Sequence, residues 1–237
     1  MTLTIVYDNN EHDPRLKTEW GFACLVEFGD HTILFDTGGD GSTLLGNMDK
    51  LGLDLRRIEA VVLSHIHGDH TGGLGGLLAM HNDVTVYVPR SFPDSFKMQV
   101  QAAGAELVEV SEPVEIVPGV YSTGEVQDGI IEQALVVTSA QGLVVITGCA
   151  HPGIVRMVEQ AQDVAKDDIY LVLGGFHLGG KSKAQISRIV ADFRRLGVQK
   201  AAPCHCSGDE ARELFAEEYG DDYILNGVGW EMSIPQQ

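Results

Sequence analysis

Runs of apolar residues, separated by glycine, proline and charged residues, divide this chain into short strands and amphipathic helices. Strands are predicted at 2–7, 21–28, 31–36, 59–64, 84–88, 143–147, 169–173 and 199–202, and the segment from 107 to 147 is rich in strands. Helices are predicted at 42–51, 93–103, 153–165, 182–196 and 208–219. Ser182 and Ser207 each stand three residues before a Gln or Glu, a capping-box spacing that supports the last two helix starts. The alternation of strands and helices in the last third indicates an α/β fold.

Histidines follow four of the predicted strands within a few residues. The stretch His65-Ile66-His67-Gly68-Asp69-His70 comes directly after the apolar run 60–63, and His151, His177 and His205 follow strands in the last third. If these strands are neighbours, the histidines gather at one edge of the sheets, where open α/β sheets bind ligands. The sequence therefore predicts two β-sheets packed face to face, flanked by helices, with a histidine cluster at one edge.

The residue types in the stretch 65–70 point to metal binding. Imidazole nitrogens and a carboxylate suit zinc, iron, manganese or cobalt. Side chains two apart in an extended segment point the same way, so His65 and His67 can bind one cation, while Asp69 and His70 diverge and can serve a second. Two cations about 3.5–4 Å apart can bridge and acidify a water, and the resulting hydroxide can attack a carbonyl or a phosphorus centre. A histidine-rich surface turn is disfavoured, because the cluster sits where a buried strand ends.

Size and charge narrow the class of substrate. The chain has 237 residues without a linker or low-complexity tract, which predicts one domain spanning residues 1–237. Its 34 acidic and 16 basic residues give a net charge of −18, which disfavours long nucleic acids because their phosphates attract basic surfaces. We therefore expect a small-molecule substrate. Candidates for a local basic patch that receives an anionic substrate are Arg156, Lys181, Lys183 and Arg188.

The sequence shows neither a membrane-spanning segment nor a signal peptide, the two features that would place the protein outside the cytoplasm. No apolar run approaches the ~18 residues of a membrane span. The start, residues 1–7, lacks the basic region and cleavage site of a signal peptide. We therefore expect a cytoplasmic protein that does not enter membranes and keeps its four cysteines reduced.

The pattern His-x-His-x-Asp-His after an apolar strand resembles the signature of the metallo-β-lactamase superfamily, and residues 33–38 resemble its early strand ending in Asp-x-Gly. Further segments resemble the dihydropterin-synthase-like branch of that superfamily, namely residues 6–10, 147–153, 174–178 and 203–208. The resemblance implies a four-layer αββα sandwich of two packed mixed β-sheets flanked by helices. It also implies a metal-dependent hydrolase, or a related transferase, that acts on a pterin or a phosphorylated aromatic substrate.

The same resemblance implies two divalent metal ions, zinc in the first place, with iron or manganese as alternatives. His65 and His67 would bind the first ion, and Asp69 and His70 the second. Asp69 would also have a catalytic role, orienting the water or accepting a proton. His205 matches the late superfamily histidine and is expected on the second ion, with a helix-capping histidine as the alternative.

The chain departs from the superfamily pattern at one point. Where the superfamily has Gly-Asp, with an aspartate that bridges both metals, this chain has Gly148-Cys149. The histidine usually found ahead of that pair is missing, and either His151 or Glu132 would take its place, with His151 favoured. Cys149 is either a thiolate ligand or a small buried residue beside the site. The departure leaves open whether both ions are bound.

Several further residues have two interpretations. His177 stands between glycine pairs and is expected to contact substrate or support a ligand, with a structural histidine as the alternative. Asp8, Asn9 and Asp36 could hold a ligand histidine by its other nitrogen, or serve ordinary turns. Cys204 and Cys206 flank His205 and are expected to pack beside the site, because a zinc knuckle needs a second cysteine pair.

Two rival functions remain open. A phosphodiesterase or nuclease of the same fold would use the same hydroxide on RNA or cyclic nucleotides, although the acidic balance counts against long polyanions. A metal-holding sensor or a diiron redox protein would use the fold without hydrolysis. Cys149, in place of the bridging aspartate, is compatible with that interpretation.

Overall fold

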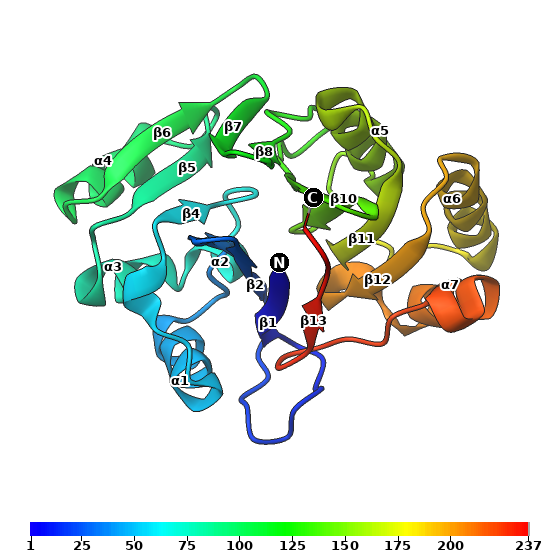
Figure 1. The fold of residues 1–237 in the computed structure, drawn as a ribbon, viewed down its shortest axis with the longest axis horizontal. Coiled ribbons are helices and arrows are strands. Elements are labelled where there is room, and N and C mark those ends of the chain that lie inside the picture. Colours follow the sequence, from blue (N-terminus) through cyan, green and yellow to red (C-terminus); the bar gives the residue numbers. More distant parts are fainter. Residues whose placement is uncertain (237) are drawn as a thin grey trace.

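The computed structural model of the protein describes residues 1–236 and contains two β-sheets packed face to face (Figure 1). The first sheet has the order β13-β1-β2-β3-β4-β5-β6 and the second the order β12-β11-β10-β9-β8-β7. The strands of the first are β1 (Thr2–Asp8), β2 (Phe22–Phe28), β3 (His31–Phe35), β4 (Ala60–Val62), β5 (Thr85–Pro89), β6 (Glu106–Val110) and β13 (Glu231–Ser233). Those of the second are β7 (Val114–Val117), β8 (Val120–Ser122), β9 (Leu135–Ser139), β10 (Gly142–Thr147), β11 (Ile169–Gly175) and β12 (Lys200–Cys204).

Both sheets are mixed. In the first, pairing is antiparallel from β13 through β3 and parallel from β3 to β6. In the second, pairing is antiparallel from β7 through β10 and parallel from β10 to β12. Helices cover the outer faces (Figure 1), with α1 (Gly41–Leu51), α3 (Leu74–Met80) and α4 (Asp94–Ala102) on the first sheet and α5 (Ile154–Ala165), α6 (Lys183–Arg195) and α7 (Asp209–Tyr219) on the second. The αββα sandwich expected from the sequence is therefore confirmed.

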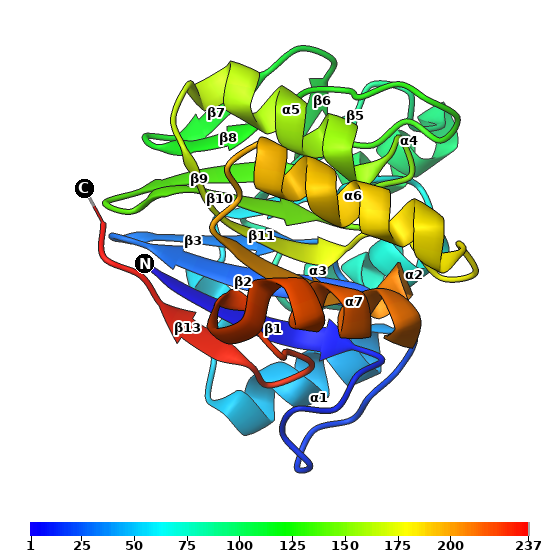
Figure 2. The same cartoon turned by 90° about the vertical axis from the view of Figure 1, so that its right-hand side faces the viewer.

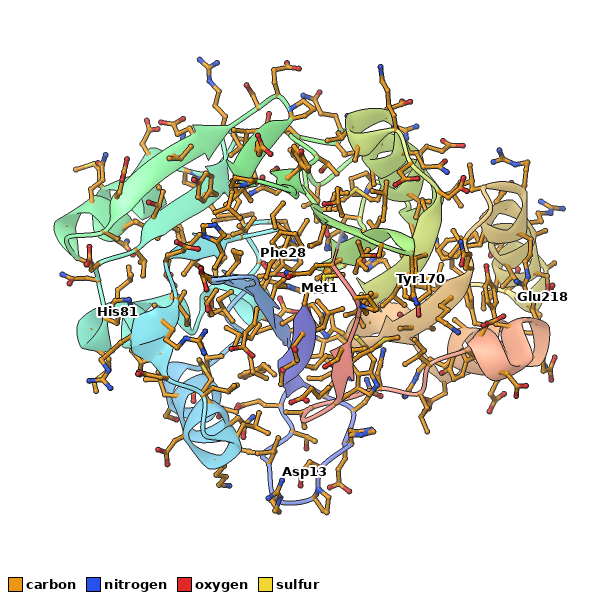
Figure 3. The ribbon with its side chains drawn as sticks, viewed as in Figure 1. Met1, Asp13, Phe28, His81, Tyr170 and Glu218 are labelled. Carbon is orange, nitrogen blue, oxygen red and sulfur yellow. The ribbon has the colours of Figure 1, made fainter. Side chains whose placement is uncertain are left out.

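The strands are apolar on both faces because each sheet is covered on both sides. In β2, Phe22, Cys24 and Val26 point into the cluster between the sheets, while Ala23 and Leu25 point toward α1 and α3. The strands β10 and β11 contribute to the same inner cluster from the opposite sheet. Figure 3 shows this filled interior, in which the labelled Phe28 and Tyr170 belong to the inner layer.

The outer layer of the second sheet is organised by three phenylalanines. Phe176 follows β11, Phe193 lies on α6 and Phe215 on α7, and their ring centroids lie 5.1–5.5 Å apart. Such tilted and edge-on contacts add to the burial of the rings. Because Phe176 directly precedes His177, this packing also fixes the loop that carries that histidine.

The predicted strands and helices are present, with ends that differ by a few residues. The capping box at Ser182 and Gln185 is formed. The one expected at Ser207 is wrong: α7 begins after Gly208, and the Ser207 hydroxyl donates to Cys204 O and accepts the N–H of Phe176 instead. Among the helices of residues 1–236, none combines the length and apolar character needed to cross a membrane.

Candidate metal centre

The histidines predicted to gather at one edge of the sheets do so. Their loops follow β4 in the first sheet and β10, β11 and β12 in the second. Figure 2 shows the short helix α2 (Gly68–Thr71), which carries part of the cluster, on the side toward which β1 and β11 run. The ring centroids of neighbouring histidines lie 4.3–5.0 Å apart in the set His65, His67, His70, His151, His177 and His205.

Two groups of candidate metal ligands share one sulfur atom. His65, Cys149 and His151 form the first group and His70, Cys149 and His205 the second, and within each group the ligand atoms lie within 4.8 Å of one another. The ring of His67 borders the first group, 4.7 Å from His65 and 4.8 Å from His151 between centroids.

Asp69 belongs with the second group. Its Oδ2 lies 3.6 Å from His70 Nε2 and 3.4 Å from His205 Nε2. The expected divergence of Asp69 and His70 is therefore wrong, because α2 turns the chain there and brings both side chains together. Burial opposes ionisation of Asp69, but the nearby imidazoles of His205 and His70 lower the pKa of the carboxyl.

Hydrogen bonds to Nδ1 orient three of the imidazoles. His70 Nδ1–H donates to Asp36 Oδ2 at 2.7 Å, and His205 Nδ1–H donates to Asn9 Oδ1 at 2.8 Å. The Ser64 hydroxyl donates to Asp36 Oδ2 at 2.7 Å, so its oxygen is left to accept the Nδ1–H of His65 at 2.9 Å. Each ring thus carries its proton on Nδ1 and presents the lone pair of Nε2, the arrangement that metal-binding histidines require.

The Nε2 atom of His70 lies 3.3 Å from Cys149 Sγ, whereas the Nε2 atoms of three other histidines have no such partner within the described residues. The Nε2 atoms of His65, His151 and His205 are buried and have no hydrogen-bond partner in residues 1–236. Burial, together with the neighbouring His177 and His67, lowers the pKa of His151 to about 4, and burial also lowers the pKa of His65. Burial opposes protonation of His70, but the Asp36 carboxylate raises the pKa of that ring. Imidazole nitrogens around a thiol and a carboxylate are a donor set that fits divalent transition metals.

Glu132 shapes the loop that carries Cys149 and His151. It is fully buried, and its carboxylate accepts the backbone N–H groups of Cys149, Ala150 and His151 at 2.8–2.9 Å. Burial raises the pKa of Glu132, while these hydrogen bonds oppose the shift. Both carboxylate oxygens are thus engaged by this loop, and His151 lies among the candidate ligands.

Cys206 lies closer to the centre than the sequence suggested. Cys149, His177 and Cys206 form a third group whose ligand atoms lie within 4.8 Å of one another. Contact with Cys149 and His177 lowers the pKa of the Cys206 thiol, and the contact with Cys206 raises that of Cys149. Its place beside His205 is the signal in the sequence for this position, and the contacts with Cys149 and His177 go beyond the packing role expected there. His177 itself is exposed at the rim.

Asp8 makes no hydrogen bond to a histidine in residues 1–236. Its Oδ1 accepts the backbone and side-chain N–H groups of Asn10, both at 2.6 Å, which fixes the turn after β1. The neighbouring Asn9 holds His205 instead. Of the two aspartates named from the sequence, Asp36 therefore has the orienting role and Asp8 the turn role.

Backbone strain is concentrated at this centre. Asp36, Ala150, His177 and His205 have φ between +48° and +59°, a region that non-glycine residues rarely adopt. Such conformations cost about 1–3 kcal/mol each and persist where surrounding contacts impose them, commonly at functional sites. The one other described non-glycine residue of this kind, Lys166, ends α5.

Residues 21–153 match the family model of the metallo-beta-lactamase superfamily, and the chain belongs to this superfamily. It is 27% identical to the 7,8-dihydropterin-6-methyl-4-(beta-D-ribofuranosyl)-aminobenzene-5'-phosphate synthase of Methanocaldococcus jannaschii, over 93% of this chain and 92% of that protein. The family and the likeness to its dihydropterin-synthase-like branch, both predicted from the sequence, are thus confirmed.

Solved structures agree with the fold. The crystal structure of a metal-dependent hydrolase of the beta-lactamase superfamily superposes with a TM-score of 0.83 at 28% identity, covering 100% of both chains. The metallo-beta-lactamase fold protein YhfI from Bacillus subtilis superposes with a TM-score of 0.74 at 13% identity, covering 98% of this chain and 99% of that chain. At that identity the second comparison concerns the fold alone.

Proposed function

We propose that this protein is a metal-dependent hydrolase, or a related transferase, that acts on a small substrate. The observation that carries the proposal is the set of buried Nε2 atoms of His65, His151 and His205, which have no hydrogen-bond partner in residues 1–236 and surround one thiol and one carboxylate. Leaving a buried polar atom unpaired costs about 1–3 kcal/mol. A bound cation removes that cost, and membership of the superfamily supports the same function.

The candidate ligands divide between two divalent ions. His65, His67 and His151 would hold the first, and Asp69, His70 and His205 the second, with Cys149 in reach of both. We expect zinc, with iron or manganese as alternatives. When bound, such ions lower the pKa of water and polarise a substrate oxygen, which is the chemistry of hydrolysis without a protein nucleophile.

The residues around the ligands supply orientation and proton transfer. Asp36, Ser64 and Asn9 fix the rings of the histidines that would bind metal. Asp69 is half-buried, with 22% of its side chain exposed, so its carboxylate is in reach of a substrate as well as of the second ion. It is our candidate for the group that orients the attacking water and accepts its proton.

The likeness to the dihydropterin-ribofuranosyl-aminobenzene phosphate synthase supports a phosphorylated aromatic or pterin-like substrate. The test is metal analysis of protein isolated without oxygen, combined with an activity screen against phosphodiesters, lactones and thioesters. We expect tightly bound divalent metal and turnover of one of these classes. In the double variant His65→Ala, His67→Ala, which removes two ligands of the first ion, turnover should be lost and the metal content should fall. Protein without bound metal, or a double variant with unchanged turnover, would refute the proposal.

A second candidate function follows from Cys149, whose sulfur lies in reach of both ligand groups. A thiolate shared between ions is compatible with a non-hydrolytic metal sensor or a diiron redox protein. Two iron atoms that can be reduced and reoxidised, in protein that turns over no substrate in the screen, would favour this alternative over hydrolysis.

A further inference from the structure

A cavity of about 350 Å³ opens beside the candidate metal centre. It lies between the loop after β10, the first turn of α5, the loop after β11 and α6. His151 and His177 line it on one side. Since His151 is also a candidate ligand of the first ion, the cavity borders the candidate centre, and a molecule in the cavity can extend toward it.

The floor of the cavity is apolar and firmly packed. Ile154, Phe176 and Leu178 line it and are almost completely buried. The ring of Phe176 is held by Phe193 and Phe215, at centroid distances of 5.4 and 5.5 Å. A surface of this kind favours a flat or aliphatic group over a strongly hydrated one.

The rim of the cavity is positively charged, although the whole chain carries a net charge of −18. Arg156 and Lys181 both line it, and the Lys181 ammonium has no hydrogen-bond or ion-pair partner in residues 1–236. Arg156 bonds Gln127 O and lies 3.4 Å from an oxygen of Asp128, but half of its side chain remains exposed. The one acidic residue of the lining, Glu159, is 3.3 Å from Arg195.

We propose that this cavity binds a small organic anion: an apolar body on Phe176 and its neighbours, and a phosphate or carboxylate at Lys181 and Arg156. The inference rests on the proposed function and names the class of substrate for that site. His177 is exposed and lies 4.3 Å from His151 between ring centroids, so it can donate a hydrogen bond to the same molecule. The ligand thereby spans from the cationic rim to the metal centre.

Isothermal titration calorimetry with phenyl phosphate, benzoate, phenol and inorganic phosphate tests this inference. Each probe is titrated into the full chain loaded with zinc and into the chain treated with a chelator. We expect phenyl phosphate or benzoate to bind both forms, about ten-fold more tightly than phenol, since hydrogen bonds to charged groups contribute about 1.5–3 kcal/mol. The tighter of the two anions identifies phosphate or carboxylate as the natural group.

The variant Lys181→Ala should weaken binding of the anion about ten-fold and leave phenol binding unchanged. Lys183→Ala is the matched control, because Lys183 is exposed, lies 3.8 Å from Glu210 and does not line the cavity. Equal binding in the two variants would overturn the proposal. So would inorganic phosphate binding as tightly as phenyl phosphate, or binding that vanishes without zinc. Because the chelated protein is measured directly, failure of the metal hypothesis leaves this result unaffected.

Discussion

At the scale of single residues, Asp36 links the two candidate metal groups. Its Oδ2 accepts from His70 of one group and from Ser64, which in turn holds His65 of the other, while its Oδ1 accepts the backbone N–H of Ser64. One buried carboxylate therefore sets the orientation of a ring in each group. Because an ionised carboxylate can only accept hydrogen bonds, it also fixes which nitrogen of each ring is free for a metal.

Asp36→Asn should test this link without a change in size. The new amide has one acceptor oxygen and one NH₂ group, so it cannot accept all three hydrogen bonds from Ser64 and His70. Its NH₂ group must face at least one N–H or O–H that the carboxylate accepted. We expect zinc affinity, measured by competition with a chromophoric chelator, to fall about 10–100-fold, as for other partners of metal-binding histidines. Asp40→Asn is the control, because Asp40 caps α1 and asparagine caps equally well. Unchanged affinity in Asp36→Asn would show that the orientation does not depend on this carboxylate.

Gly148 occupies a position where only glycine fits. A Cβ there would lie 2.1 Å from Ser64 Oγ and 2.8 Å from Asp36 Oδ2, inside the network just described. We expect Gly148→Ala to lower the free energy of unfolding by about 1–3 kcal/mol through overpacking, and to weaken metal binding as well. Urea unfolding followed by circular dichroism measures the first effect.

Gly46 provides the opposite case for the same substitution. It lies within α1, and a Cβ there would meet nothing within 4 Å. Gly46→Ala should therefore raise the free energy of unfolding by about 0.5–1 kcal/mol, because alanine is the better helix former. If both variants moved stability in the same direction, close approach at Gly148 would not be the reason for its glycine.

The sequence indicates the candidate ligands better than their supports. His65, His67, Asp69 and His70 share one short motif, and His205 stands alone after a strand, so local pattern is enough to select them. The role of Ser64 depends on Asp36, which lies 28 positions away. Such contacts between distant positions form only when the sheets assemble, and no local pattern encodes them.

At the scale of elements, a loop held by one side chain carries two of the candidate ligands. The segment after β10 leaves the sheet at Thr147, and three of its backbone N–H groups donate hydrogen bonds to the Glu132 carboxylate. We expect Glu132→Gln to lower the free energy of unfolding of the metal-free protein by about 1–3 kcal/mol, because the amide must turn a donor toward at least one of these N–H groups.

The same denaturant titration on Glu112→Gln gives the control, since Glu112 is exposed. The Glu132 variant should also bind its first metal ion more weakly, because His151 follows Cys149 on that loop. Equal stability of the two variants would mean that the loop holds its shape without the carboxylate.

The predicted elements agree best with the structure where the apolar residues follow a strong periodic pattern. The predicted helix 182–196 appears as α6, with Ile186, Val190 and Phe193 buried at helical spacing. The strand β13 was not predicted, because it has only three residues, Glu231–Ser233, and two of them are exposed at a sheet edge, which is too short a run for a recognisable pattern. Its pairing with β1 is set by tertiary packing.

At the scale of the whole molecule, the candidate centre lies across the two sheets. The stretch with His65, His67 and His70 follows β4 of the first sheet, and His151 and His205 follow β10 and β12 of the second. An ion held by these residues therefore connects two layers that otherwise meet through the apolar cluster between them. Binding to the folded chain alone must then stabilise the sandwich as a unit.

Metal removal should consequently lower the thermal midpoint of the whole protein. With free zinc at about 1,000 times its Kd, binding stabilises the fold by about 4 kcal/mol. For a chain of this size each kcal/mol corresponds to about 2–4 °C, so the Tm should fall by roughly 10 °C when a chelator removes the metal. Scanning calorimetry with and without chelator measures the shift. It should shrink in His65→Ala, His67→Ala, which removes two ligands of the first ion, and persist in full in His12→Ala, since His12 is exposed and lies in the loop between β1 and β2. A midpoint that does not respond to the chelator would mean that no ion joins the two sheets.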